Sequence, residues 1–237
     1  MLNTHYTYFL ILVASVAGPL ALSFDKKVAF YKKWKYVFPA MLIPAVLYIG
    51  WDIFFTAKEV WSFNENYVTG LKIINLPVEE ILFFFVVPYC CLFIYECTSI
   101  YFPRLRKRKW GDRVLQLLAV TLFITGIFFY NRSYTASTFI STAVFIAILY
   151  GFKNYFKSFD ATVFLISFCI ILFPFLLVNG FLTTIPVVLY NDEENLGLRI
   201  YTIPFEDSFY GMLLVMMDIA IYEKLSAKTN EQLKTLN

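Results

Sequence analysis

Two pairs of carboxylates stand at the start of two long apolar stretches. The motif PVEE ends with Glu79 and Glu80, and the motif PFED ends with Glu206 and Asp207. Proline fits the first turn of a helix, and acids there complement the positive end of the helix dipole, so both motifs also fit ordinary helix starts. A carboxylate in apolar surroundings costs on the order of several kcal/mol unless it is paired or protonated. Four acids at matched places therefore favour a functional site over a helix cap.

Such a site is suited to proton chemistry. Two neighbouring carboxyl groups in a poorly hydrated pocket do not ionise together, so one keeps its proton while the other stays an anion. Aromatic rings are frequent beside both motifs. Their faces can stabilise a carbocation, although ordinary packing and interfacial belts also use such rings. Two polar residues, Asp52 and Asn179, lie within apolar stretches, where they either join the site or bond a neighbouring helix. The candidate substrate-binding residues are Trp51, Asp52, Phe83, Asn179, Phe205 and Tyr210.

The two motifs belong to an internal repeat. The sequence LPVEEILFFFVVPYCCLFIYE, at 76–96, aligns without a gap to IPFEDSFYGMLLVMMDIAIYE, at 203–223, which begins 127 positions later. The same spacing pairs Asp52 with Asn179. An ungapped register of this length indicates a duplication. If each copy holds three membrane spans and a fourth span joins them, the copies run parallel, and both motifs lie on one side of the membrane.

Composition predicts that the chain lies in a membrane. Hydrophobic residues make up 59% of the 237 positions and charged residues only 16%. A spanning helix needs about 20 mostly apolar residues, and we expect seven. The third and seventh reach that length only if the acidic residues near their ends are included. The uncharged stretches are 6–24, 36–51, 81–95, 114–130, 133–152, 161–191 and 208–217.

The predicted fold is therefore an all-α polytopic membrane bundle of seven transmembrane helices, formed by two parallel three-helix repeats and one linking helix. The first repeat is expected at 1–112, the linking helix at 113–132, and the second repeat with a cytoplasmic tail at 133–237. Most of the 20 Lys and Arg residues lie at 25–35, at 104–113, and after the fifth and seventh stretches. The positive-inside rule then places the N-terminus outside and the C-terminus in the cytoplasm. The basic loops suit a membrane surface and not a nucleic acid.

Several other classes of site are disfavoured. The single histidine, His5, excludes a multi-histidine metal site, and the four cysteines lack zinc-ligand spacing, so we expect no metal. The chain has no glycine-rich nucleotide fingerprint. Glu96 and Glu223 also match across the repeat, but they lie about 25 Å along a helix from the acidic motifs. We expect them to be ion-pair partners near the basic loops.

Two P-x-E-[E/D] motifs on the third and seventh spans of a duplicated bundle resemble the integral-membrane lycopene cyclases of carotenoid synthesis. That family occurs as paired small subunits in some bacteria and as a domain fused to phytoene synthase in fungi. The resemblance runs from the first span to Glu223, with both halves in one chain, and a bacterial cytoplasmic membrane is the expected location. The family motif falls on Pro77, Glu79, Glu80, Pro204, Glu206 and Asp207.

The resemblance implies an intramolecular lyase or isomerase that needs no cofactor. Protonation of the terminal double bond of lycopene would give a cation, attack by the neighbouring alkene would close a six-membered ring, and proton loss would give a β-ionone end. The products would be γ-carotene and β-carotene. We expect Glu79 or Glu206 to be the general acid, with Glu80, Asp207 and Asp52 as counter-charge or base. The expected partners are lycopene and membrane lipids, and the oligomeric state is left open.

Two rival functions stay open from the residues alone. Parallel repeats and intramembrane acids also describe a proton-coupled membrane transporter. The second rival function is a membrane prenyltransferase-like enzyme of isoprenoid metabolism, because NDEE at 191–194 resembles an acidic diphosphate-binding site. The matching stretch NENY at 64–67 is less acidic, so a solvated loop is the better interpretation of NDEE. A retinal pigment is excluded, because 208–222 holds no lysine for a Schiff base.

Overall fold

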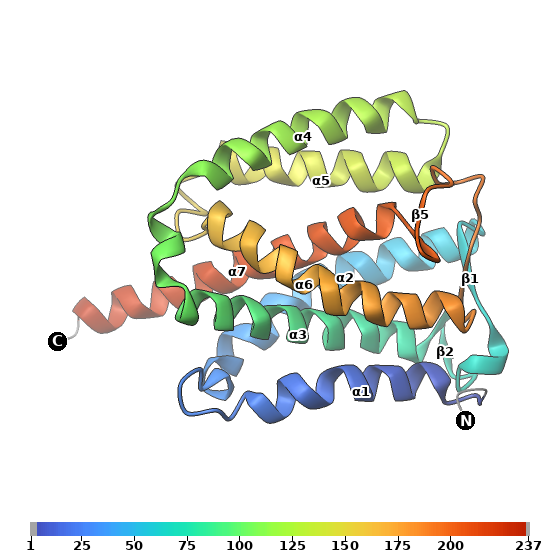
Figure 1. The fold of residues 1–237 in the computed structure, drawn as a ribbon, viewed down its shortest axis with the longest axis horizontal. Coiled ribbons are helices and arrows are strands. Elements are labelled where there is room, and N and C mark those ends of the chain that lie inside the picture. The colour runs from blue at the N-terminus through green and yellow to red at the C-terminus, as the bar shows by residue number, and fades with distance from the viewer. Residues whose placement is uncertain (1–3, 236–237) are drawn as a thin grey trace.

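Seven α-helices form one bundle in the part of the chain that the structure, a computed structural model, describes, residues 4–235 (Figure 1). Five of them are long and apolar enough to cross a membrane: α2 to α6, with α2 extended by the preceding 3-10 helix. The shorter α1 is also apolar. The helices are α1 (Thr7–Leu22), α2 (Trp34–Ala57), α3 (Val78–Tyr101), α4 (Trp110–Phe128), α5 (Ser133–Gly151), α6 (Ala161–Thr184) and α7 (Glu206–Thr235).

The bundle presents apolar side chains outward as well as inward. Leu117 on α4 is 70% exposed and Phe173 on α6 is 78% exposed. A helix that is apolar on all sides is stable when lipid or protein surrounds it, and it satisfies its backbone polar groups internally. The structure therefore agrees with the multi-pass membrane class that the composition predicts.

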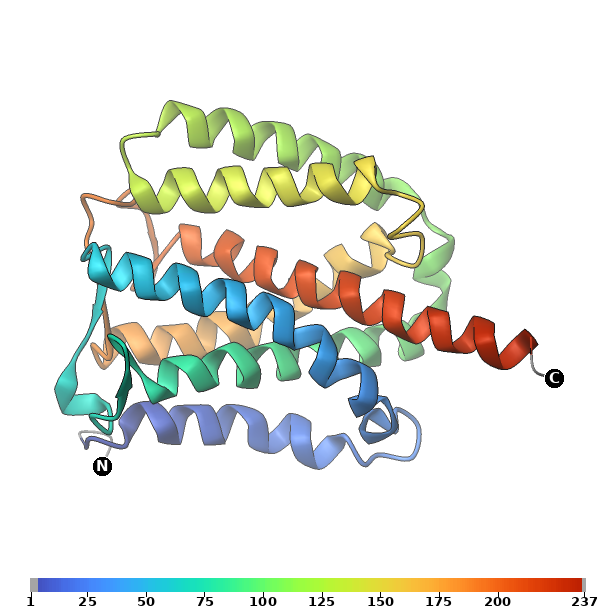
Figure 2. The same ribbon diagram turned by 180° about the vertical axis from the view of Figure 1, so that it is seen from behind.

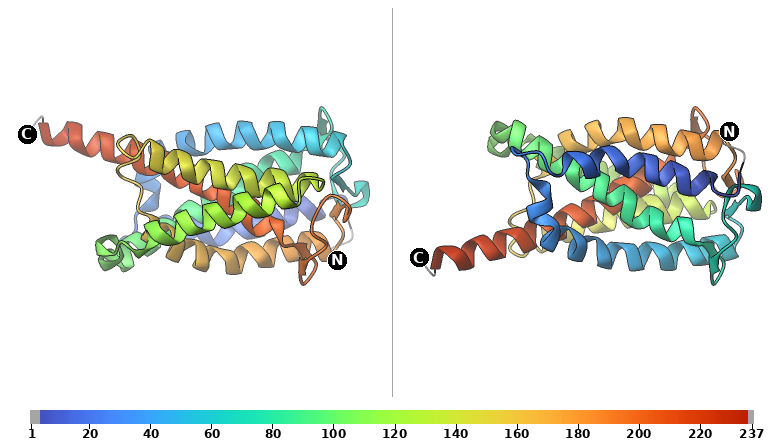
Figure 3. Two further views of the ribbon diagram at one scale, coloured as in Figure 1. Left: turned by 90° about the horizontal axis from the view of Figure 1, so that it is seen from above. Right: turned by 90° about the horizontal axis from the view of Figure 1, so that it is seen from below.

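The helices of the two halves exchange partners. Helix α2 packs against α7, and α6 packs against α3. The pair α4 and α5 lies along one edge of the bundle and α1 along the opposite edge, as Figure 2 shows. Views from above and below show all seven helices roughly aligned with one long axis (Figure 3).

Six short strands gather at one end of the bundle, on the right in Figure 1. Strand β1 (Trp61–Phe63) pairs antiparallel with β4 (Val188–Tyr190) and joins the two halves. Each acidic motif is preceded by its own two-stranded hairpin. These hairpins are β2 (Lys72–Ile73) with β3 (Leu76–Pro77), and β5 (Arg199–Ile200) with β6 (Ile203–Pro204).

The uncharged stretch at 161–191 is predicted as one membrane span. In the structure it is not helical along its whole length. Helix α6 ends at Thr184, and the last part of the stretch forms β4. The physical reason is the proline at position 186, which disfavours a helical conformation in the residue before it. The apolar character of the strand residues conceals this break from a search for uncharged windows.

The opposite end of the bundle carries the basic loops and two matched ion pairs. Lys33 pairs with Glu96 on α3, and Arg106 pairs with Glu223 on α7 at 2.5 Å. The ion-pair role predicted for both glutamates is confirmed. Each glutamate also accepts a hydrogen bond from a tyrosine of the other helix, and these distances are 2.6 Å for Tyr222 to Glu96 and 2.7 Å for Tyr95 to Glu223.

Candidate functional site

Each acidic motif is placed in the first turn of its helix by the hairpin before it. The hairpin turns contain Ile74 and Tyr201, which hold matching left-handed conformations with φ of 62° and 60°. Further upstream, Gly70 and Gly197 also have positive φ, a conformation that glycine adopts without steric cost. The chain thus enters α3 and α7 by the same path, and corresponding acids receive corresponding positions.

The first acid of each motif binds the backbone of its own loop. Glu79 accepts the N–H of Thr69 at 2.8 Å, and Glu206 accepts the N–H of Leu196 at the same distance. Both glutamates are fully buried. Glu206 also accepts a hydrogen bond from the Thr135 hydroxyl at 2.5 Å. Among the residues that the structure describes, the second oxygen of each glutamate has no hydrogen-bond donor.

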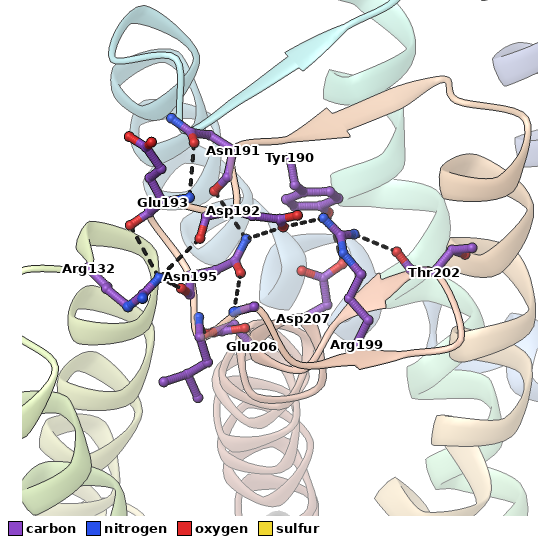
Figure 4. Close-up of polar contacts among 12 residues, drawn as sticks. Arg132, Tyr190, Asn191, Asp192, Glu193, Asn195, Arg199, Thr202, Glu206 and Asp207 are labelled. Carbon is purple, nitrogen blue, oxygen red and sulfur yellow. Dashed lines mark hydrogen bonds and ion pairs between the residues drawn. The ribbon is translucent and has the colours of Figure 1, made fainter.

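The loop before Glu206 is fixed by a polar network (Figure 4). Arg132 donates to the carbonyl oxygens of Asp192, at 3.0 Å, and of Asn195. Arg199 pairs with Asp192, whose side chain is 60% exposed, and donates to a neighbouring carbonyl across the hairpin. The acidic residues of NDEE therefore serve as loop contacts at a solvated surface, as predicted.

The second acid of the first motif forms a carboxyl pair with Asp52. Glu80 accepts the Tyr8 hydroxyl at 2.6 Å, and Asp52 accepts the indole N–H of Trp61 and the Thr56 hydroxyl, the latter at 3.3 Å. The two carboxyl groups are close enough to interact electrostatically. Both are buried, with 9% and 1% of their surface exposed. Two buried carboxyl groups that interact do not ionise together, so the pair is suited to hold a proton.

The second acid of the second motif has different neighbours. Asp207 is 3% exposed and accepts two phenolic hydroxyls, from Tyr134 at 2.5 Å and from Tyr190 at 2.8 Å. Burial, with the neighbouring Asp207 charge, raises the pKa of the Tyr190 hydroxyl well above its ordinary value, so it remains a donor. Two short hydrogen bonds from neutral donors stabilise the ionised form of the carboxylate. Asn179, which corresponds to Asp52, donates instead to the Phe175 carbonyl of its own helix at 2.9 Å.

Glu80 and Asp207 line the same small cavity, whose volume is about 40 Å³. It lies between the two halves of the chain, because α3 contributes one acid and α7 the other. Three predicted substrate-binding residues, Phe83, Asn179 and Tyr210, also line it. The cavity combines a buried carboxyl pair, a second carboxyl group with two hydroxyl donors, and aromatic faces, so it can protonate an alkene and stabilise the resulting cation.

Other predicted site residues lie outside this cavity's lining. Glu79 and Glu206 contact the loops described above, and Asp52 contacts two lining residues, Trp61 and Glu80. Trp51 packs against the Tyr210 ring, with centroids 5.3 Å apart. Phe205 packs in a separate cluster between α4 and α5 and the start of α7.

Comparison with known proteins identifies the family of this chain. The sequence pattern of the lycopene cyclase family matches residues 5–98 and 131–225. The chain belongs to the lycopene cyclase family. The resemblance predicted from the two motifs is thereby confirmed. The matched residues of this family member leave out 99–130, the region that contains α4.

The lycopene cyclase-family chain is also similar to three fungal proteins named bifunctional lycopene cyclase/phytoene synthase. It is 24% identical over 83 residues to that of Aspergillus niger, 29% over 84 residues to that of Phaeosphaeria nodorum and 26% over 125 residues to that of Gibberella fujikuroi. These alignments cover 33%, 33% and 50% of this chain, but only 14%, 14% and 20% of the relatives. No solved structure matches the chain.

Several polar and aromatic residues around the acids of this cavity were not predicted from the sequence. One signal for two of them is present in the repeat: Tyr8 and Tyr134 each stand near the start of the first helix of a half. They are 126 positions apart, one fewer than the main register, so an ungapped alignment does not pair them. The missed residues are Tyr8, Trp61, Tyr134, Phe175 and Tyr190.

Proposed function

We propose that this chain is a lycopene cyclase that converts the linear ends of lycopene to β-ionone rings, giving γ-carotene and β-carotene by an isomerisation. The observation that carries this proposal is the shared cavity in which Glu80 and Asp207 meet. One acid has a proton-sharing partner and the other has two hydroxyl donors, so their roles differ. The family membership supports the substrate class.

The reaction balances with the groups of the cavity alone. Glu80 transfers its proton to the terminal double bond, and a tertiary cation forms. The electron pair of the neighbouring alkene then makes the carbon–carbon bond of the ring and leaves the positive charge on a ring carbon. Asp207 removes a proton from the adjacent carbon, and the electrons of that C–H bond become the ring double bond. One proton is added and one removed, and the proton returns to the Glu80–Asp52 pair.

The surroundings of the carboxylates lead us to assign the acid role to Glu80. The sequence favours Glu79 or Glu206 for this role, but these glutamates bind loop N–H groups and do not line the cavity. We propose that they hold the hairpins in place. Asp52 keeps the proton on the pair, and the rings of Phe83 and Tyr210 face the developing positive charge.

We further propose that all seven helices cross the membrane as two parallel repeats joined by α4. The described contacts repeat at a spacing of 127 positions, as the hydrogen bonds of Glu79 and Glu206 illustrate. The proposed parts are 1–112, 113–132 and 133–237, of which 1–3 and 236–237 lie outside the described residues. The basic loops lie at the end opposite the acidic motifs, which supports an orientation with the N-terminus outside, and we propose a bacterial cytoplasmic membrane as the location.

Expression of the chain in lycopene-producing cells tests the function directly. We expect the extracted pigment to contain monocyclic and bicyclic carotenoids, separated by chromatography and identified by their absorption. The Glu80→Gln variant, present in the membrane at the same level, should leave the lycopene linear. Linear lycopene in cells with well-inserted wild-type protein would overturn the proposal, and so would full cyclisation by Glu80→Gln.

A further inference from the structure

A second, larger cavity opens between α1, α3 and α6. Its volume is about 600 Å³, and its wall is almost entirely apolar. Ser15 and Asn179 are the only lining residues with a side-chain hydroxyl or amide, and both satisfy it on their own helix. We call this cavity the α1–α3–α6 groove. Leu10 and Leu177, which line it, are exposed, so the groove opens at the outer apolar surface of the bundle.

The α1–α3–α6 groove adjoins the small cavity lined by Glu80 and Asp207, which we call the acid cavity. Phe175 and Asn179 line both, so these two residues of α6 stand at the junction. The Phe175 ring lies directly over Gly211 of α7, where an added Cβ would meet ring atoms at 2.6 and 2.8 Å. The absence of a side chain at Gly211 thus makes room for the ring beside the passage between the two cavities.

The position related to this junction by the internal repeat is filled. Phe83, Phe175 and Val178 correspond to Tyr210, Tyr48 and Trp51. The rings of Tyr210, Tyr48 and Trp51 pack closely against one another. Their centroids are 4.6 Å apart for Tyr48 and Tyr210, 5.3 Å for Trp51 and Tyr210, and 5.6 Å for Tyr48 and Trp51. The Tyr48 hydroxyl also donates to the Tyr210 carbonyl at 2.9 Å. Of the two related positions, the one beside α1 is therefore the open one.

We propose that the α1–α3–α6 groove holds the polyene shaft of the substrate, which enters from the lipid and passes Phe175 to bring one end to Glu80. This inference rests on the proposed cyclase function and adds the path and direction of binding. An apolar, lipid-facing wall suits a long hydrocarbon, and the single polar junction suits the end at which charge develops. The groove thus presents one end of the polyene to the acid cavity at a time.

The length of the groove agrees with this direction. Its lining residues on α6 run from Ile171 to Phe181, which is about 15 Å at 1.5 Å per residue. The hydrocarbon core of a membrane is about 30 Å thick. The part of a polyene that extends beyond the groove would remain among the lipid chains, so a second ring requires release and rebinding in the opposite direction.

Two alanines on α1 provide a matched test. Ala14 lines the groove, whereas Ala17 does not, and both are exposed, so a large side chain at either position leaves the protein core intact. In lycopene-producing cells we expect Ala14→Trp to lower the cyclised fraction at least tenfold and Ala17→Trp to leave it unchanged. Both variants would be compared at equal amounts of membrane-inserted protein.

Pigment binding is measured separately from activity. Each tryptophan is combined with Glu80→Gln, the protein is purified in mild detergent from lycopene-producing cells, and bound lycopene is measured by its visible absorbance per protein. We expect at least a fivefold loss with Ala14→Trp only. If the two tryptophans lower cyclisation and lycopene binding equally while the wild type is active, the proposed binding groove is wrong and the cyclase function is supported. If the wild type does not cyclise lycopene but binding of lycopene still depends on Ala14, the proposed cyclase reaction is wrong and the proposed binding groove is supported.

Discussion

Substitution of Glu79 and of Glu80 by glutamine, one at a time, distinguishes the proposed proton donor, Glu80, from the glutamate that binds the loop, Glu79. In Glu80→Gln, the amide oxygen can still accept from Tyr8, and the amide N–H can donate to the Asp52 oxygen that has no other hydrogen-bond donor among the described residues. The fold therefore keeps its contacts, but the proton is lost. General acid catalysis contributes about 10² to 10⁴ in rate, or about 3–5 kcal/mol of barrier, so we expect a loss of that size.

Glu79→Gln should have the reverse effect. The amide oxygen can replace Oε1 as acceptor for the Thr69 N–H, but the new amide N–H₂ takes the place of an oxygen that has no donor in the described structure. A buried donor without an acceptor costs about 1–3 kcal/mol of folding free energy. We expect a lower unfolding temperature in detergent, together with wild-type turnover per folded molecule, because this side chain does not line the acid cavity.

The assay pairs pigment analysis with a thermal unfolding curve for each variant. Cyclised carotenoid is measured by chromatography and divided by the amount of folded protein in the membrane. The reasoning fails if Glu79→Gln loses more turnover per folded molecule than Glu80→Gln does. It also fails if Glu80→Gln unfolds several degrees below wild type, since its loss of activity would then have a structural cause.

Two further substitutions test the surroundings of the acids. Tyr190→Phe removes one of the two donors to Asp207. A hydrogen bond to a charged group is worth about 1.5–3 kcal/mol, so turnover should fall about 10- to 100-fold, and Tyr201→Phe, at an 81% exposed position, should have no effect. Equal turnover in both variants would contradict the base role. Gly211→Ala should push Phe175 into the junction and raise the apparent KM for lycopene in detergent micelles more than it lowers kcat. An unchanged KM would show that the ring is not at the passage.

The sequence was sufficient to predict the helical membrane class and the first-turn placement of all four acids. It was not sufficient to divide the roles of neighbouring acids. Successive residues of a helix point about 100° apart, so Glu79 faces its loop while Glu80 faces the cavity, and this direction depends on how α3 is rotated against its neighbours. The partners of Glu80 come from α1 and α2, and those of Asp207 from α5 and β4, which only tertiary packing brings together.

The short strands were missed for a related reason. A strand of three residues has too few positions to show an alternating pattern, and β1 finds its partner in the other half of the chain. The pairing places Trp61 opposite Tyr190, and these two side chains donate to Asp52 and Asp207. A cross-half strand pair therefore positions one donor for each carboxylate, and neither sequence segment indicates this alone.

The exchange of helix partners between the halves has an evolutionary consequence. Because α2 rests on α7 and α6 rests on α3, neither half by itself encloses the space between Glu80 and Asp207. A primordial gene that encoded one half could have made this centre only by self-association of two identical products. If the two motifs descend from one duplicated gene, tandem fusion would allow the two sides of the centre to differ, as Asp52 and Asn179 do at corresponding positions.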